Sequence, residues 1–286
     1  MDEKPTKNES GLAKAKKAVV DALDQNQNGM LDIEDVIIGS MRLPGICIDR
    51  ESFLRKQLKA HCTEDVVEKA IAETPLRAKV PLETLDKIAD AVIQFERNCV
   101  SGISAAISMP GGVAMVATIP ADILQYYGYL LRASQKLLYL YGFPQLDASE
   151  TAGEFDDATM NTMILCLGIM YGTAGASNAL KSVSRAIGVG VEKKLLKRAL
   201  TKGTMYPMIK NTAKWFGVNI TKKVFAEFFK KAIPVAGGVL GGAITYLTFK
   251  PCCEKLKKEL QESIFEDPLC DSSYGFIMEY PAYEID

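Results

Sequence analysis

The sequence predicts an all-α protein, and three observations lead to that class. Apolar residues recur at the spacing of one helix face, most clearly after Pro81, at Leu82, Leu85, Ile88, Ala89, Val92 and Phe95. Alternation of apolar and polar residues, which marks a half-buried strand, never lasts in this chain. Residues that typically open a helix also precede several segments, as Thr63-Glu64-Asp65 and Pro81 do.

The expected helices of the N-terminal part are short and closely spaced. After a polar start they are expected at Leu12–Leu23, Ile33–Met41, Arg50–His61 and Thr63–Glu73. Pro44-Gly45 ends the second of them, because neither residue favours a continuing helix. A longer helix is expected from Pro81 onward.

Three long stretches without a charged residue follow, namely Cys99–Ala121, Ala158–Leu180 and Ala232–Phe249. We expect the first to be broken at Pro110-Gly111-Gly112 and again at Pro120. A bilayer-spanning helix needs about 20 consecutive apolar residues. The second stretch has that length but contains Asn161 and Asn178, and the third is marginal in length. Glycines of the third stretch have the spacing that lets helices approach closely, which serves membrane and soluble packing equally well.

Residues 24–35, DQNQNGMLDIED, match the ligand pattern of an EF-hand loop. Calcium prefers six to eight oxygen ligands, and this loop supplies them at alternating positions. The expected ligands are the side chains of Asp24, Asn26, Asn28, Asp32 and Asp35 and the backbone carbonyl of Met30. Gly29 occupies the sixth position, where the chain must turn sharply. The sequence therefore predicts one divalent cation site between two helices.

The twelfth position of this loop is Asp35, where a bidentate Glu is usual. The shorter side chain lowers the expected affinity for Ca²⁺. It makes the affinity for Mg²⁺, which requires near-octahedral geometry, higher relative to that for Ca²⁺. An ordinary turn rich in Asn and Asp is the alternative, because the same residues dominate turns that bind no ion. EF-hands normally occur in pairs, and no second loop lies nearby in the sequence. A structural ion and a regulatory ion are therefore equally compatible with this loop.

These features predict an EF-hand-like helix-loop-helix that leads into a helical bundle with small-residue-rich apolar helices. We expect a flexible start over residues 1–10 and an EF-hand-containing module over residues 11–80. Residues 81–262 would form the main domain, and residues 263–286 an acidic C-terminal tail.

The formal net charge of −1 conceals strong segregation of charge along the chain. The segment Lys181–Lys231 holds thirteen Lys or Arg against two Glu. Within it, Lys222–Lys231 combines lysines with Val and Phe on one helix side, which is typical of a helix bound to an anionic membrane surface. The alternative is the solvated face of a soluble bundle. No nucleic-acid-binding motif accompanies the basic residues, so we do not expect nucleic acid as a partner.

The expected compartment is the cytoplasm, with peripheral binding to the cytosolic face of a membrane as an option. The first residues contain no apolar core of a secretory signal. The seven cysteines are odd in number and scattered, which argues against a disulfide framework.

Several phrases after Lys87 resemble the EcsC-like family of bacterial proteins. These are IADAVIQ (88–94), MPGGVAMVATIPADILQYYGYLLRASQKLLYLYG (109–142) and AIPVAGGVLGGAITYLTF (232–249). The resemblance covers about residues 85–262 and does not include the EF-hand loop. It implies a helical architecture, a bacterial source and frequent membrane association, but no established reaction. Asp122 and Arg132 match polar positions of that family, whose roles are not established.

No constellation for catalysis stands out in the sequence. The single histidine, His61, is followed directly by Cys62, and neighbours in sequence rarely have the geometry of a catalytic pair. GVGVEK at residues 188–193 lacks the third glycine of a dinucleotide-binding fingerprint. The sequence thus predicts a non-enzymatic, membrane-associated accessory or regulatory protein that binds Ca²⁺ or Mg²⁺. The alternative is a soluble interaction module in which the metal is structural or absent.

Overall fold

A computed structural model describes residues 21, 23, 24, 32–107, 113–146, 156–188, 207, 209–214 and 237–265. Within these ranges the regular secondary structure is entirely helical and no β-strand occurs. The predicted all-α class is therefore confirmed.

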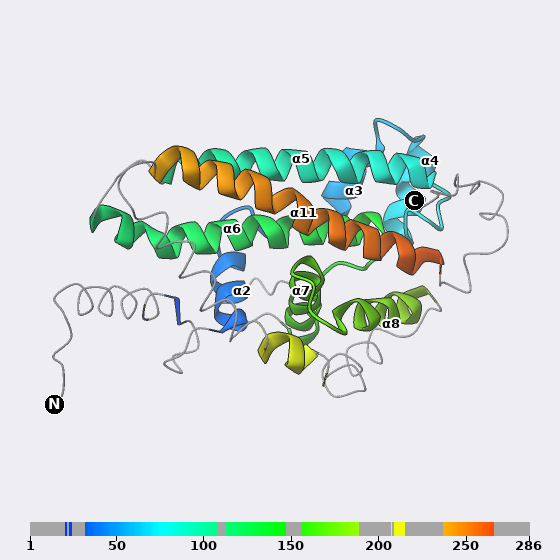
Figure 1. Ribbon diagram of the computed structural model, residues 1–286. Helices are drawn as coiled ribbons and strands as arrows, with labels where there is room; N and C mark the ends of the chain where they lie inside the picture. The colour runs from blue at the N-terminus through cyan, green and yellow to red at the C-terminus, as the bar shows by residue number, and fades with distance from the viewer. Residues whose placement is uncertain are drawn as a thin grey trace, which may run out of the picture.

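Three long helices form the spine of the molecule: α5 (Leu82–Ile107), α6 (Val113–Leu140) and α11 (Gly237–Phe265). They lie side by side in Figure 1, with α5 antiparallel to both of the others. Helices α5 and α11 are tied by the Lys257 ammonium, which lies 2.7 Å from a carboxylate oxygen of Asp90.

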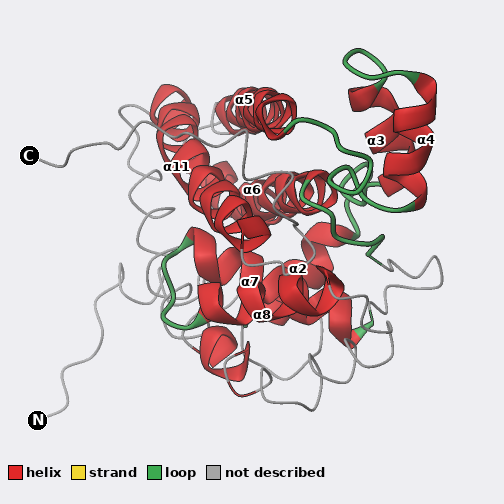
Figure 2. Cartoon of the chain, turned by 90° about the vertical axis from the view of Figure 1, so that its right-hand side faces the viewer, coloured by secondary structure: helices red, strands yellow, loops and turns green. Residues whose placement is uncertain are grey.

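Helices α2 (Ile33–Met41), α7 (Asp157–Met170) and α8 (Ala176–Gly188) form a second layer against this spine. Figure 2, which looks along the long helices, shows this layer on one side of them. The short helices α3 (Arg50–Leu58) and α4 (Glu64–Ala72) pack on each other, and α3 also contacts α6.

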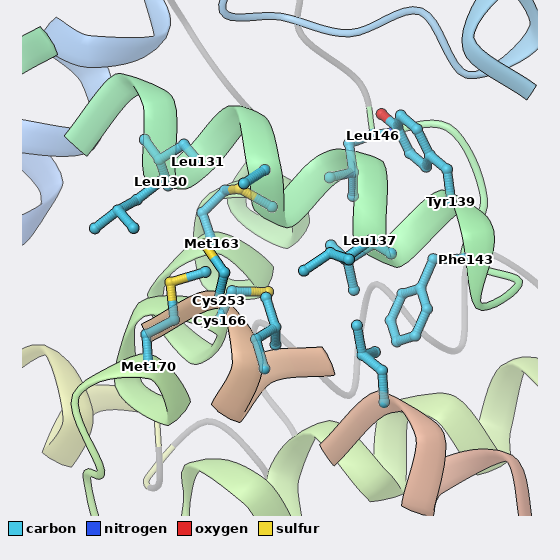
Figure 3. Close-up of a cluster of buried hydrophobic side chains, with 14 of the residues drawn as sticks. Leu130, Leu131, Leu137, Tyr139, Phe143, Leu146, Met163, Cys166, Met170 and Cys253 are labelled. Atoms are coloured by element: carbon cyan, nitrogen blue, oxygen red, sulfur yellow. The ribbon is translucent and has the colours of Figure 1, made fainter. Parts of the chain in front are cut away.

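Helix α7 belongs to the core, and every one of its residues from Asn161 to Met170 is buried. In Figure 3 its Met163, Cys166 and Met170 lie among leucines of α6 and Cys253 of α11. A helix that is apolar all round is either a core helix or a membrane span. The uncharged stretch Ala158–Leu180 is thus a core helix, a turn and the start of α8.

One glycine of α7 allows a close approach between neighbouring segments. A Cβ atom built on Gly168 would lie 2.6 Å from Cγ2 of Thr212 and 3.0 Å from Cβ of Ala176. The first distance is shorter than side chains tolerate, so only glycine fits this contact without a shift of the backbone.

Predicted helix boundaries agree with the structure where a local signal exists. Helix α2 spans the predicted residues, and Asp32 caps its N-terminus. The expected break at Pro120 is wrong, because α6 runs from Val113 to Leu140 without interruption. Proline removes one backbone donor from a helix, and packing along the rest of a long helix can offset that loss.

Arg50 joins α3, α4 and the end of α6 in a way that no local pattern predicts. Its guanidinium is buried and donates four hydrogen bonds to backbone carbonyls, those of Ala70, Ile71, Glu73 and Phe143, at 2.7–3.2 Å. The first three carbonyls belong to the C-terminal end of α4, which has no helical donors of its own for them.

No helix in the described ranges combines the length and the apolar character needed to cross a bilayer.

Candidate metal centre

The candidate metal loop ends in the first turn of α2, where two of its predicted ligands meet. The backbone N–H of Asp35 donates to Oδ1 of Asp32 at 3.0 Å, and the N–H of Asp32 donates to Oδ2 of Asp35 at 3.0 Å. This reciprocal pair is a capping box, which satisfies two backbone donors at a helix N-terminus. It also fixes both carboxylates at the same end of the helix.

Asp35 is completely buried, although it is a carboxylate. Ile33, Val36 and Ile37 around it are buried too, because α2 packs its apolar side against α6 and α7. A buried carboxylate requires compensation by hydrogen bonds or by a cation. Asp35, which stands where an EF-hand usually has a glutamate, thus lies in the protein interior, and its carboxylate accepts a hydrogen bond there.

The opposite end of the loop begins at the predicted ligand Asp24. Leu23 before it is fully buried, and the residue at 24 is half-buried. The predicted ligands Asn26, Asn28 and Met30 lie outside the described residues. The structure therefore places three of the six predicted ligands and brings two of them, Asp32 and Asp35, into direct contact.

The chemistry of these groups is compatible with a hard divalent cation. An ionised carboxylate offers about four acceptor sites, and the capping box uses one site on each residue. Groups of three or more His, Cys, Asp or Glu that could hold a metal ion do not occur among the described residues. The set predicted for this loop relies in part on amide and backbone oxygens, which fall between Asp24 and Asp32.

Negative charge concentrates at the start of α2 beyond the predicted ligands. The pKa of Glu34 is raised, first because neighbouring protein atoms displace part of its hydration. The carboxylates of Asp32, Asp35 and Asp157 raise this pKa further, while Lys210 opposes them. Asp157 comes from the N-terminus of α7, so no local sequence pattern links it to this negative field. Such a field attracts cations.

A second polar cluster lies between α5 and α6 and joins three ionic side chains. Glu96 is fully buried, and one of its carboxylate oxygens contacts both the Lys136 ammonium and Nε of Arg132, the latter at 3.2 Å. Burial lowers the pKa of Lys136, and the negative charge of Glu96 partly offsets that effect. Arg132 also donates to the backbone carbonyl of Gly45 at 3.0 Å.

Asp122 and Arg132, which resemble polar positions of the EcsC-like family, both make contacts between helices. Arg132 belongs to the cluster with Glu96, and Asp122 is buried, where its Oδ1 accepts a hydrogen bond from the Ser104 hydroxyl at 3.1 Å. Both contacts link α5 to α6. These polar contacts fix the register of the two helices.

The groups considered for catalysis do not form a reactive pair. His61 is exposed at the turn after α3, and burial raises the pKa of the neighbouring Cys62 thiol. Burial also raises the pKa of Cys166 to about 12. A thiol with a raised pKa carries little thiolate at neutral pH and is a weak nucleophile.

Most of the predicted basic membrane-binding segment lies outside the described residues, including Lys222–Lys231. At its beginning, Lys181 forms an ion pair with Glu262 of α11 at 3.1 Å. The first three residues of the predicted acidic tail, 263–265, belong to α11, and its remaining residues, 266–286, lie outside the described residues.

Comparison of this chain with protein-family models, with curated proteins and with solved structures found no match.

Proposed function

We propose that this protein binds one divalent cation, Ca²⁺ or Mg²⁺, through the loop of residues 24–35, and acts as a non-enzymatic accessory or regulatory protein at a membrane surface. The observation that carries the metal proposal is the joint position of Asp32 and Asp35 at the start of α2. The sequence places a ligand residue at every position of the loop where an EF-hand requires one. The charges around Glu34 support the proposal: its pKa is raised first by burial and then by the carboxylates of Asp32, Asp35 and Asp157, which lie near the start of α2.

The close contact between α2 and α6 supports a regulatory role. A Cβ atom built on Gly39 of α2 would lie 2.7 Å from Cδ2 of Leu124 on α6, so the two helices approach closely. An ion bound by Asp32 and Asp35 would therefore act on a helix in direct contact with the spine. Interiors packed this tightly transmit small displacements rather than absorb them.

Isothermal titration calorimetry with CaCl₂ and MgCl₂ tests the metal proposal. The wild-type chain should bind one ion, and Asp24→Ala should weaken binding at least about tenfold, because it removes an anionic ligand. Asp21→Ala is the matched control, since Asp21 is exposed, lies one turn earlier and is outside the loop. A wild-type chain that takes up neither ion at millimolar concentration contradicts the proposal.

Membrane association is supported by the charge of Lys181–Lys231 and by the resemblance of residues 85–262 to EcsC-like proteins. Basic residues near an anionic surface each contribute about 1 kcal/mol to binding. Flotation with phosphatidylcholine vesicles, with and without about a third of anionic lipid, tests this part separately. We expect the protein to float with the anionic vesicles. Its complete absence from the floated fraction contradicts association.

One observation favours the alternative of a soluble interaction module. The capping box alone gives Asp32 and Asp35 protein donors, as an ordinary helix start does without any ion. Thermal unfolding separates the two cases, because a ligand that binds only the folded state stabilises it by about 2.7 kcal/mol at 100 times its Kd. A melting temperature that does not respond to Ca²⁺ or Mg²⁺ favours the module.

A further inference from the structure

The three long helices of the spine end together at one end of the molecule. The Ser104–Asp122 hydrogen bond places the C-terminal part of α5 beside the N-terminal part of α6. The Arg97 guanidinium lies 3.9 Å from the centre of the Tyr246 ring, which places the same part of α5 beside α11. Figure 1 shows these ends extending past α2 at the left of the molecule. We call the helical residues 98–107, 113–121 and 237–249 the bundle end.

The bundle end contains no charged residue in any of its three helices. Charged residues resume at Arg97 on α5, at Asp122 on α6 and at Lys250 on α11. The carboxyl group at 122 is buried and hydrogen-bonded to Ser104, so it does not present a charge to the outside. Three neighbouring helices thus lose their charged residues toward the same end of the bundle.

The length of this uncharged part matches one leaflet of a membrane. At 1.5 Å per residue, the ten residues from Arg97 to the end of α5 extend about 15 Å, and the stretch from Lys250 to the start of α11 extends about 20 Å. Half of the hydrocarbon core of a bilayer is about 15 Å thick. Insertion to that depth needs no spanning helix, and none is found in the described ranges.

The described side chains at the base of the bundle end have the character of a membrane interface. Leu247 is 69% exposed and Tyr246 is 43% exposed, and with Phe95 they are the only large apolar side chains so exposed among the described residues. Two of these three are consecutive on α11. Tyrosine typically sits at the headgroup level of membranes. Arg97 lies at the same level, where its guanidinium can approach lipid phosphates, whereas the Lys250 ammonium nearby pairs with Glu254 at 3.2 Å.

We propose that the bundle end inserts into one leaflet of a lipid bilayer, with Tyr246, Leu247 and Arg97 at its base, at the boundary between the headgroups and the acyl chains. This inference rests on the membrane association proposed above and assigns that association to a surface. A second copy of the chain or a protein partner could also cover the exposed side chains of α11, and the test distinguishes these occupants.

Site-specific photocrosslinking in vesicles tests the proposal. Benzoylphenylalanine placed at residue 247 should form adducts with lipid on irradiation. The control position is Lys258, which is exposed and lies eleven residues later on the same face of α11, about 17 Å toward the opposite end. It should give no lipid adduct.

A pair of charge substitutions gives a second readout that does not depend on crosslinking. Gly102→Asp introduces a charge into the bundle end without a clash, because a Cβ atom at Gly102 meets no atom within 4 Å. Combined with Leu247→Asp, it should lower the vesicle-bound fraction on the order of tenfold. Ala91→Asp is the matched control, since Ala91 is exposed on α5, eleven residues before Gly102, and it should leave binding unchanged. Circular dichroism melting confirms that all variants are folded.

The outcomes separate this inference from the proposed membrane association. Lipid adducts at residue 247 and none at 258 support insertion. If the wild type floats but residue 247 gives no lipid adduct, or if both substitutions leave binding unchanged, another surface holds the membrane and the inference is wrong. A dimeric protein adduct at residue 247 in place of the lipid adduct identifies a second copy and also overturns it. If the wild type does not float, the association itself fails.

Discussion

The two ends of the helical spine differ in how they are held together. At the end where α5 begins and α11 finishes, charged groups join the helices, as in the Lys257–Asp90 and Lys181–Glu262 pairs, and Arg50 caps α4 nearby. At the bundle end the same three helices carry no charge. One set of helices therefore meets two environments along its length. The uncharged stretches of the three helices are therefore confined to one end of the bundle, and the other parts of the same helices carry charged residues.

The largest expected effect concerns Arg50 at the charged end. Arg50→Ala removes four hydrogen bonds to backbone carbonyls in a buried place, so we expect it to lower the free energy of unfolding by about 4 kcal/mol. Urea unfolding measures this change. The control is Arg55→Ala on the same helix, a surface arginine that pairs with Glu51 at 3.1 Å and also with Glu64 and Glu68, and this substitution should cost much less than Arg50→Ala. Equal effects of the two substitutions would show that the hydrogen bonds of Arg50 to buried carbonyls stabilise the protein no more than the surface ion pairs of Arg55 do.

A somewhat smaller effect is expected for Glu96 in the middle of the spine. Glu96→Ala leaves Lys136 and Arg132 without their shared carboxylate and should cost about 3 kcal/mol in urea unfolding. Glu83→Ala, which removes an exposed pair with Lys87 at 2.6 Å on the same helix, should change the stability far less than Glu96→Ala. A Glu96 variant as stable as the Glu83 variant would mean that the buried ionic cluster does not hold α5 to α6.

Two glycines sharpen the contrast between the core and the bundle end. Gly168→Ala introduces a contact of 2.6 Å with Thr212 and should destabilise the protein by about 1–3 kcal/mol. Gly102→Ala meets open space in a helix and should stabilise it by about 0.5–1 kcal/mol. Thermal melting of both variants measures the difference. Changes of the same sign at the two positions would contradict the packing described for them.

The smallest expected effect is a pH dependence at the start of α2. The raised pKa of Glu34 means that its protonated form is favoured in the folded state, so its charge destabilises the fold as pH rises through that pKa. Glu34→Gln should therefore be more stable than the wild type at pH 7, by less than about 1 kcal/mol because part of the side chain remains exposed to solvent. The difference should vanish below about pH 4, where both side chains are neutral. Saturating Ca²⁺ should reduce it at pH 7, because a bound cation compensates the acidic residues.

A Glu34→Gln variant that is less stable than the wild type at neutral pH would contradict the excess of negative charge. Urea unfolding at pH 7 and pH 4, with and without CaCl₂, distinguishes these outcomes.

Local signals made α2 predictable from the sequence. Asp32 before an apolar run fixes its start, and Pro44-Gly45 limits its end, so both boundaries were correct. The helical class followed in the same way from apolar periodicity. The expected break at Pro120 was wrong, because the effect of a proline on a helix depends on packing that the sequence does not display.

Long-range contacts were not predictable. Arg50 reaches Phe143, and Glu96 reaches Lys136, across separations of 93 and 40 residues that carry no periodic pattern. The candidate metal centre shows both situations. The spacing of its predicted ligands is a local pattern that is visible in the sequence. The approach of Asp157 from α7 depends on the fold.

The central claim is that residues 24–35 surround a divalent cation, and a crystal structure grown in millimolar CaCl₂ tests it most directly. The account predicts an anomalous peak with oxygen atoms of Asp24, Asp32 and Asp35 at about 2.3–2.6 Å from it. An ordered loop without a peak, in which the Asp32–Asp35 capping box is the complete set of contacts at the helix start, would contradict the account.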